Sequence, residues 1–228
     1  YRPNIAILSG IAWDHINVFP TFENYVEQFE QFCNLIEPDG TFVFNTEDEE
    51  VAKLGQQFLT KLKTVPYATP VYEVTETGTL LHFENKKYAL KIFGAHNLQN
   101  LMGAMRLGEA IGISPDDFFT AVQTFTGAGK RLQLVAEKDN FTFYKDFAHS
   151  PSKLKATTKA VKEQFNQRKV IACMELHTFS SLKKEFLPHY QHAMDHADIA
   201  VVYFSHEVVQ HKKLEPITAK QVQEAFGG

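Results

Sequence analysis

The chain has 228 residues, of which 44% are hydrophobic and 22% charged, and its formal net charge is -4. This composition is typical of a globular protein with enough apolar residues for one large or two small cores, and it argues against disorder. Four arginines and a negative net charge exclude the dense basic surface that nucleic acid requires. No apolar run approaches the roughly 20 residues that span a bilayer, and the cytoplasm is the expected compartment.

The first part of the chain predicts alternating strands and helices. Residues 3–9 read as a buried strand, and apolar residues at helical spacing over residues 22–36 predict an amphipathic helix. Residues 41–45 predict a second strand, after which Thr46 and Glu49 form a capping box that predicts the start of another helix. This order favours an α/β fold with a mainly parallel sheet and covering helices.

A different pattern follows and ends at a boundary. Residues 70–93 alternate apolar and polar side chains between turn residues, which predicts a β-meander. Helices are predicted over about residues 97–111 and from Ser114, whose following proline and two aspartates are typical of a helix start. Because Gly127-Ala128-Gly129 is the one small-residue cluster between two patterned halves, the predicted domains are residues 1–128 and 129–228.

The second domain is predicted to be Rossmann-like, with a hairpin followed by helices and parallel strands. Continuous apolar runs at residues 170–174 and 199–204 predict strands buried on both faces. Cys33 and Cys173 lie in apolar surroundings and are predicted to be buried, reduced thiols. The other predicted elements are a hairpin at 132–137 and 141–147, a helix capped by Ser150, helices from about Ser181 and Thr218, and a pattern cut short at Gly228.

Two features predict that the chain is a piece of a longer protein. The strand at residues 3–9 has no helix or initiator methionine before it. The sequence also lacks a G-x-x-x-x-G-K-[ST] phosphate loop, because residues 127–130 do not supply that spacing. Any such loop is therefore expected upstream.

The segment Gly94 to Asn100 combines side chains that can bind a planar heterocycle. On a helix beginning near Asn97, the side chains of His96, Asn97 and Asn100 emerge on neighbouring faces of the first turn and can both donate to and accept from a base edge. From these residues alone, a helix cap is the favoured interpretation.

Other motifs place this helix entrance in a family context. Asp14-His15, Gly129-Lys130-Arg131 and the run from Lys145 to Pro151 (Lys-Asp-Phe-Ala-His-Ser-Pro) occur in an order that resembles the Mur ligases. These are ATP-dependent, amide-forming enzymes of peptidoglycan precursor assembly. The chain most resembles the branch that acts on UDP-N-acetylmuramate. Within that branch, residues 175–182 (Glu-Leu-His-Thr-Phe-Ser-Ser-Leu) resemble the murein-peptide recycling ligases, which attach an intact tripeptide.

The resemblance implies an ATP site. His96, Asn97 and Asn100 would bind the adenine base. Arg131 would contact the phosphate or ribose of ATP and take part in catalysis, and Asp146 would accept hydrogen bonds from the ribose hydroxyls. A fixed guanidinium suits a phosphate contact of this kind. A structural turn aspartate is the alternative interpretation of Asp146.

The resemblance also implies a metal ligand and an acceptor site. His15 would bind a magnesium ion, although magnesium prefers oxygen ligands and an Asx turn at Asp14 is the alternative. His149 would orient substrate near the reacting groups or, equally, cap its loop. His177, Thr178 and Ser180 would line the site of the incoming peptide amine. The expected substrates are ATP, UDP-N-acetylmuramate and a murein tripeptide.

Alternatives stay open at this point. The acceptor could be L-alanine, or the protein could be a folate polyglutamate ligase, which the motifs after Gly129 disfavour. A non-catalytic nucleotide- or protein-binding module would also fit the missing phosphate loop. His189, His192 and His196 have a spacing that resembles a zinc site on a helix, but a solvated helix face explains them better. The position of the metal-binding, carbamoylated lysine of some Mur ligases aligns with Phe29, a departure that fits the muramate branch and leaves the number of metal sites open.

Overall fold

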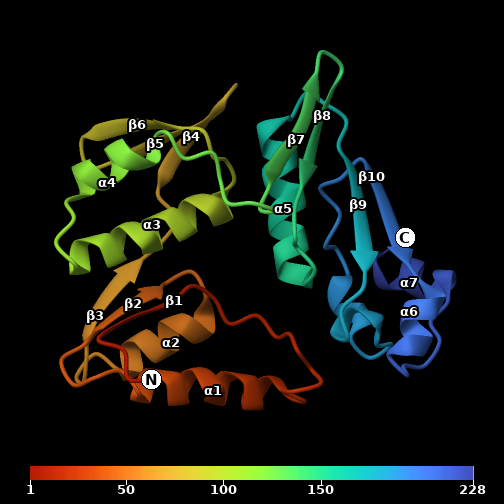
Figure 1. Cartoon of the computed structure of the whole chain (residues 1–228), viewed down its shortest axis with the longest axis horizontal. Helices are drawn as coiled ribbons and strands as arrows, with labels where there is room; N and C mark the ends of the chain where they lie inside the picture. The colour runs from red at the N-terminus through yellow and green to blue at the C-terminus, as the bar shows by residue number, and fades with distance from the viewer. Residues whose placement is uncertain (228) are drawn as a thin grey trace. The chain divides into compact units, whose positions relative to one another are not determined.

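The computed structural model describes residues 1–227 and divides into two compact units, each described by itself (Figure 1). Unit 1 contains residues 1–13 and 19–125. Unit 2 contains the segment Asp14–Val18 and the residues from Thr126 on. Gly228, where the sequence predicts a pattern cut short, lies outside the described residues.

Unit 1 begins with the predicted parallel sheet. Strands β1 (Ile5–Leu8), β2 (Thr41–Asn45) and β3 (Lys63–Tyr67) pair in parallel in the order β1-β2-β3. The intervening helices are α1 (Phe22–Asn34) and α2 (Glu49–Gln57). The α/β fold class is therefore confirmed.

Helix α2 starts differently from the prediction. Its N-cap is Asp48, whose Oδ1 accepts the backbone N–H of Val51 at 3.0 Å. The hydroxyl of Thr46 instead donates to the backbone oxygen of Tyr67 at 3.1 Å, on the neighbouring strand. The predicted capping box at Thr46 and Glu49 is wrong, because Asp48 caps the helix and the hydroxyl of Thr46 bonds to the end of β3.

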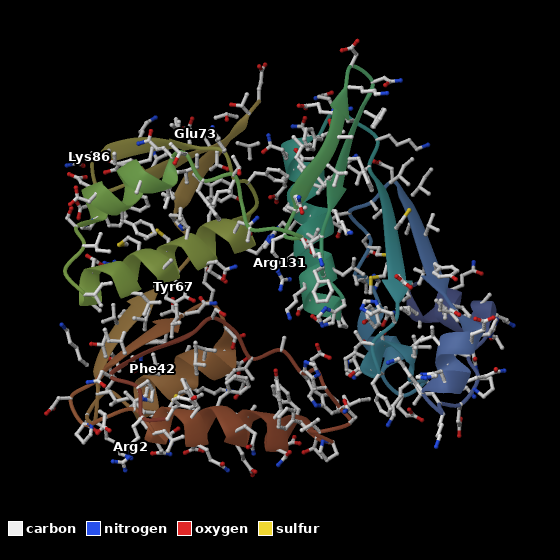
Figure 2. All side chains as sticks on the ribbon, in the orientation of Figure 1. Arg2, Phe42, Tyr67, Glu73, Lys86 and Arg131 are labelled. Atoms are coloured by element: carbon white, nitrogen blue, oxygen red, sulfur yellow. The ribbon has the colours of Figure 1, made fainter. Side chains whose placement is uncertain are left out.

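Strand β2 is the centre of unit 1, since all five of its residues are buried. Phe42 and Phe44 pack with residues of α1 and α2, whereas Val43 packs on the opposite face with residues of α3. Figure 2 shows the same division, with Phe42 on the side of α1 and α2 and Tyr67 on the side of α3. Burial on both faces is expected of a central parallel strand.

Close packing at α2 predicts a large effect for Gly55→Ala. A Cβ at Gly55 would lie 2.3 Å from Cε2 of Phe44, a ring that is 3% exposed. We expect the substitution to destabilise unit 1 by about 1–3 kcal/mol, the usual range for overpacking. Gly108→Ala is the matched control, because its nearest contacts are 3.6 Å away and alanine favours a helix. Urea unfolding of both variants measures the difference, and equal stability would contradict the expectation.

The β-meander predicted for residues 70–93 is confirmed. Strands β4 (Val71–Thr75), β5 (Gly78–Phe83) and β6 (Lys86–Leu90) pair antiparallel in that order. Helices α3 (Ala95–Ala110) and α4 (Pro115–Val122) follow. The first two turns of α3 thus carry the predicted base-binding residues.

Unit 2 contains a hairpin, a two-stranded parallel sheet and several helices. Strands β7 and β8 pair antiparallel, and β9 and β10 pair in parallel. Its elements are β7 (Gln133–Lys138), β8 (Phe141–Lys145), α5 (Pro151–Gln164), β9 (Ile171–Leu176), the 3-10 helices η1 (Ser180–Leu182) and η2 (Leu187–Tyr190), β10 (Ile199–Phe204), α6 (His206–His211) and α7 (Ala219–Ala225).

The sheet of β9 and β10 is buried on one face, not on both as predicted. Met174 and Leu176 belong to the core of unit 2, whereas Ile171, Val201 and Tyr203 are 61%, 46% and 60% exposed. Cys173 shares the exposed face, so its predicted burial is wrong, while Cys33 is buried. The core of unit 2 packs against one side of this sheet only, within the described residues.

The three histidines with zinc-like spacing do not share a helix. His189 lies in η2, while His192 has a left-handed backbone (φ 63°) and contacts Asp195 at 2.8 Å. No group of three or more His, Cys, Asp or Glu residues that could hold a metal occurs among residues 1–227. In the same residues, no helix has the length and apolar character needed to cross a membrane.

Candidate functional site

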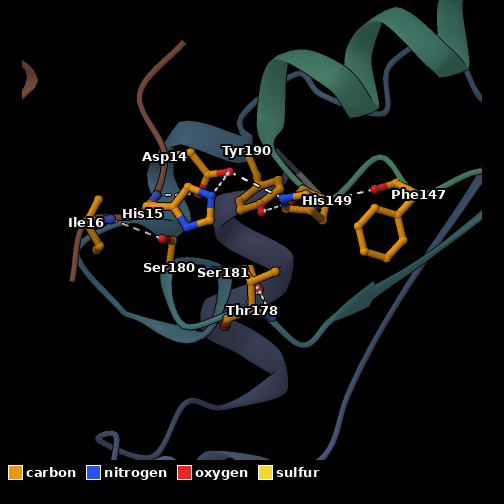
Figure 3. Close-up of polar contacts among 9 residues, drawn as sticks. All are labelled: Asp14, His15, Ile16, Phe147, His149, Thr178, Ser180, Ser181 and Tyr190. Atoms are coloured by element: carbon orange, nitrogen blue, oxygen red, sulfur yellow. Dashed lines mark hydrogen bonds and ion pairs between the residues drawn. The ribbon is translucent and has the colours of Figure 1, made fainter. Parts of the chain in front are cut away.

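The candidate site in unit 2 is built around a buried ion pair. Asp14 is 7% exposed, and its Oδ2 lies 3.3 Å from Nε2 of His149 (Figure 3). Oδ1 of Asp14 accepts the backbone N–H of His15 at 2.7 Å. Burial alone would raise the pKa of Asp14, but the contacts with His149 and His15 outweigh it and lower that pKa to about 2.

His149 is held from both sides of its ring. Its Nδ1 lies 3.0 Å from the backbone oxygen of Phe147, and its Nε2 faces Asp14. Both partners are acceptors, and an imidazole can donate from both nitrogens only when it is protonated. The hydrogen bond to Asp14 raises the pKa of His149 against the opposing effect of burial. This arrangement favours the protonated form of His149 and disfavours a role as a general base.

The backbone of His149 is also fixed. The hydroxyl of Tyr190, a fully buried side chain, donates to the backbone oxygen of His149. Helix α5 begins two residues later with Pro151, and the hydroxyl of Ser150 forms no cap hydrogen bond. The predicted cap at Ser150 is therefore correct in position but not in its side-chain bond.

Arg131 and His177 lie around the ring of Phe147. The guanidinium carbon of Arg131 is 5.7 Å from the centre of this ring, and the rings of His149 and His177 lie at 5.3 and 6.3 Å. Phe147 is 48% exposed. Sequence reasoning gave Phe147 no role, although it lies inside the run from Lys145 to Pro151. Unit 2 thus gathers a guanidinium, two imidazoles and an exposed aromatic ring.

Arg131 lies in strained backbone. Its two neighbours, Lys130 and Leu132, both have left-handed φ angles, of 58° and 42°. Such conformations are costly for residues other than glycine and are found preferentially at functional sites. The main chain here is held by Asp146, whose Oδ2 accepts the N–H of Leu132 at 2.6 Å.

Asp146 is a turn residue in this structure. Besides Leu132, its carboxylate accepts the backbone N–H of Ala148 at 2.6 Å and lies 3.5 Å from the hydroxyl of Thr157. These bonds match the structural alternative considered for this residue. They do not use all the acceptor positions of a carboxylate, so the implied contact with ribose stays a prediction.

His177, Thr178 and Ser180 follow strand β9. Nδ1 of His177 lies 3.2 Å from the backbone oxygen of Glu175. The Thr178 hydroxyl is 2.9 Å from that of Ser181 and accepts the N–H of Ser181 at 3.1 Å. Ser180 is only 3% exposed, and its hydroxyl accepts the N–H of Ile16 at 3.4 Å. In this structure Ser180 therefore faces residues 14–18 and not an open site.

The predicted base-binding residues lie in unit 1, at the start of α3. Gly94 is the N-cap with a φ of 90°, a conformation that favours glycine. The side-chain amide of Asn97 donates to the backbone oxygen of Phe93 at 2.9 Å, while Asn100 is exposed. His96 precedes Asn97 in the first turn of the helix. Asn97 therefore fixes the helix entrance, and Asn100 is available to a ligand.

The site provides few groups for a metal. His15 has a side chain that is 66% exposed, whereas the carboxylate of Asp14 is committed to His149. Magnesium usually takes only one or two protein ligands together with water and phosphate oxygens. His15 fits as one such ligand and not as part of a complete cage.

Comparisons with known proteins define the class of this chain. Residues 1–108 match the Mur ligase middle domain, and residues 130–226 match the Mur ligase glutamate ligase domain. The two matches together cover most of the sequence. The chain belongs to the Mur ligase family.

The curated relatives that the chain matches include several UDP-N-acetylmuramate–L-alanine ligases. The UDP-N-acetylmuramate–L-alanine ligase of Roseiflexus sp. strain RS-1 is 24% identical over 86% of this chain and 48% of its own length. The enzyme of the same name from Caldicellulosiruptor saccharolyticus is 29% identical over 80% of this chain and 43% of its own length. The chain thus spans about half the length of the curated relatives it matches.

Solved structures share the fold. The UDP-N-acetylmuramate–alanine ligase of Thermotoga maritima has a TM-score of 0.62 at 20% identity, covering 93% of this chain and 48% of that protein. A murein peptide ligase from Psychrobacter arcticus has a TM-score of 0.53 at 16% identity, covering 100% of this chain and 58% of that protein.

Proposed function

We propose that this chain is part of a cytoplasmic, ATP-dependent ligase that forms an amide bond at the carboxylate of UDP-N-acetylmuramate. The observation that carries the proposal is the arrangement of Arg131, His149 and His177 around Phe147 in unit 2. A fixed guanidinium beside imidazole donors suits a reaction in which phosphate and carboxylate charges must be held and neutralised.

The proposed reaction has two steps. A carboxylate oxygen of the muramoyl group attacks the γ-phosphorus of ATP, ADP leaves, and an acyl phosphate forms. The amine nitrogen of the acceptor then attacks the acyl carbon, phosphate leaves with the bridging oxygen, and the nitrogen loses a proton to solvent. Such phosphoryl transfer depends mainly on positioning and charge neutralisation.

The residues of this chain divide that work between them. His96, Asn97 and Asn100 would bind the adenine, while Asp146 would bind the ribose. Arg131 would contact the phosphates, and His149, whose contact with Asp14 favours its protonated form, would stabilise negative charge on the reacting groups. Magnesium, when bound, would neutralise phosphate charge, and His15 is the residue that would touch it. None of these proposed roles asks His149 to accept a proton.

The parent protein is the longer protein of which this chain is proposed to be a part, and it would include an upstream phosphate loop. Phosphate release by the parent protein tests the ligase proposal. Release from ATP should require both UDP-N-acetylmuramate and an amine acceptor. The 228-residue chain alone carries no such loop in its sequence and is expected to release no phosphate. ATP binding without turnover in the parent protein would instead support a nucleotide-binding module, and turnover by the isolated chain would show that the upstream loop is not needed.

The observations disagree about which amine is the acceptor. The curated relatives are L-alanine ligases, and they favour L-alanine over the tripeptide that residues 175–182 suggest. In favour of the tripeptide, that segment has no arginine to grip a small amino acid's carboxylate. The nearby lysines are engaged as well: Lys183 lies 5.0 Å from the ring centre of Phe179, and Lys184 is 3.5 Å from Glu215.

A comparison of acceptors decides between them. With ATP and UDP-N-acetylmuramate saturating, kcat/KM is measured for L-alanine and for L-alanyl-γ-D-glutamyl-meso-diaminopimelate. The relatives predict the larger value for L-alanine. A larger value for the tripeptide would assign the protein to peptide recycling and leave its assignment as a ligase intact.

A further inference from the structure

The segment Asp14–Val18, called here the His15 segment, belongs to unit 2 although the residues on both sides of it belong to unit 1. It also lies within the residues that match the middle domain of the family. Its place in unit 2 therefore depends on its own contacts and not on its neighbours in the sequence.

Three kinds of contact hold the segment. Asp14 pairs with His149 at 3.3 Å, the N–H of Ile16 donates to Ser180 Oγ at 3.4 Å, and the side chain of Ile16 packs against the core of unit 2. The charged contact is buried, since the Asp14 and His149 side chains are 10% and 14% exposed. A charged hydrogen bond with little exposure to solvent is stronger than a surface pair.

The partners of the segment are themselves fixed. Ser180 lies in a turn that is closed by the bonds between Thr178 and Ser181, and Tyr190 donates to the backbone of His149. Figure 3 shows His149 and Ser180, the two anchors of the segment, together with His15. His15 has a left-handed backbone (φ 55°), and its ring is 66% exposed. The anchors on each side thus determine where the imidazole of His15 is presented.

We propose that His149 and Ser180 are positioning residues that dock the His15 segment onto unit 2 and present the imidazole of His15 to a bound divalent cation. The docking step stands on the contacts above. Its consequence for the cation rests on the proposed ligase function. This role for Ser180 differs from lining the acceptor site, and it explains why a buried hydroxyl faces a segment far away in the sequence.

Amide hydrogen exchange in the 228-residue chain tests the docking step without any activity. Asp14→Asn and Ser180→Ala should each speed exchange at His15 and Ile16 by at least about five-fold, the factor expected when one ordinary hydrogen bond is lost. Thr158→Val is the matched control, because Thr158 is also 3% exposed in this unit and its hydroxyl donates to Ala193 at 3.2 Å. It should leave these two amides unchanged. Unchanged exchange in both docking variants, or equal acceleration by the control, would overturn the proposal.

The parent protein tests the consequence for the cation. Ser180→Ala should raise the magnesium concentration needed for half-maximal turnover at least about three-fold, with a smaller change in kcat at saturating magnesium. A fall in kcat with no change in magnesium dependence would overturn the cation step. Absence of turnover in the unmodified parent would contradict the ligase proposal instead, and the exchange measurement would still decide the docking step.

Discussion

Replacing Arg131 by alanine in the parent protein is expected to lower kcat/KM for ATP about ten- to a hundred-fold. This factor corresponds to the loss of one charged hydrogen bond, which is worth about 1.5–3 kcal/mol. Within the described residues no carboxylate pairs with Arg131, whose guanidinium lies over Phe147. Its removal should therefore affect ATP use more than folding. Steady-state kinetics with thermal melts of each variant measure both.

Arg168→Ala is the matched control for this experiment. Arg168 also lies over a phenylalanine ring, 5.6 Å from Phe165, but it donates to the hydroxyl of Thr142 at 2.8 Å and has no proposed contact with ATP. It should alter stability and leave the KM for ATP unchanged. Asp146→Ala should impair both properties, because its carboxylate holds the backbone around Leu132. An Arg131 variant with the parent's ATP kinetics would refute the assigned phosphate contact.

The second large effect is expected for Asp14→Asn, and it depends on pH. Asp14 has its pKa lowered from 3.8 to about 2, so its contribution to stability is present above about pH 4 and is lost as the pH falls toward 2. The pKa of His149 is raised above 6.5, so its contribution is full below 6.5 and is lost as the pH rises through the raised value. Both contributions are complete between about pH 4 and 6.5.

In that pH window the free energy of unfolding of the variant should be about 2 kcal/mol lower than that of the unmodified chain, because the pKa of Asp14 is lowered from 3.8 to about 2. The difference should shrink above pH 6.5. Urea unfolding across pH, together with an NMR titration of His149, measures it. Asp195→Asn is the control, since its pair with His192 is exposed and should contribute little. A stability difference that stays constant across pH would contradict this account. A His149 pKa that is the same in the variant as in the unmodified chain would contradict it as well.

The parts of the fold that the sequence predicts well are those fixed by local patterns. The order of strand and helix in the first part of the chain follows from the spacing of apolar residues. The helix start predicted at Ser114 is confirmed, with the Ser114 side chain accepting the N–H of Asp117, because a cap satisfies N–H groups only two or three residues away. Long, periodic segments carry this information within themselves.

The contacts that assemble the site are not local. Ile16 and Ser180 are 164 positions apart in the sequence, and no periodicity relates them. The motif residues Asp14 and His149 could be selected as candidates, but their pairing, which raises the pKa of His149, follows only from the fold. Thr46 and Cys173 show the same limit, since a neighbouring strand takes the hydroxyl of Thr46 and the packing of one sheet face exposes Cys173.

Oxygen transfer is the measurement that tests the central claim most directly. UDP-N-acetylmuramate carrying oxygen-18 in its muramoyl carboxylate is incubated with the parent protein, ATP and an acceptor, and the released phosphate is analysed by mass spectrometry. An acyl phosphate intermediate predicts that one labelled oxygen moves into phosphate for each amide bond formed. Amide formation with unlabelled phosphate would contradict the account.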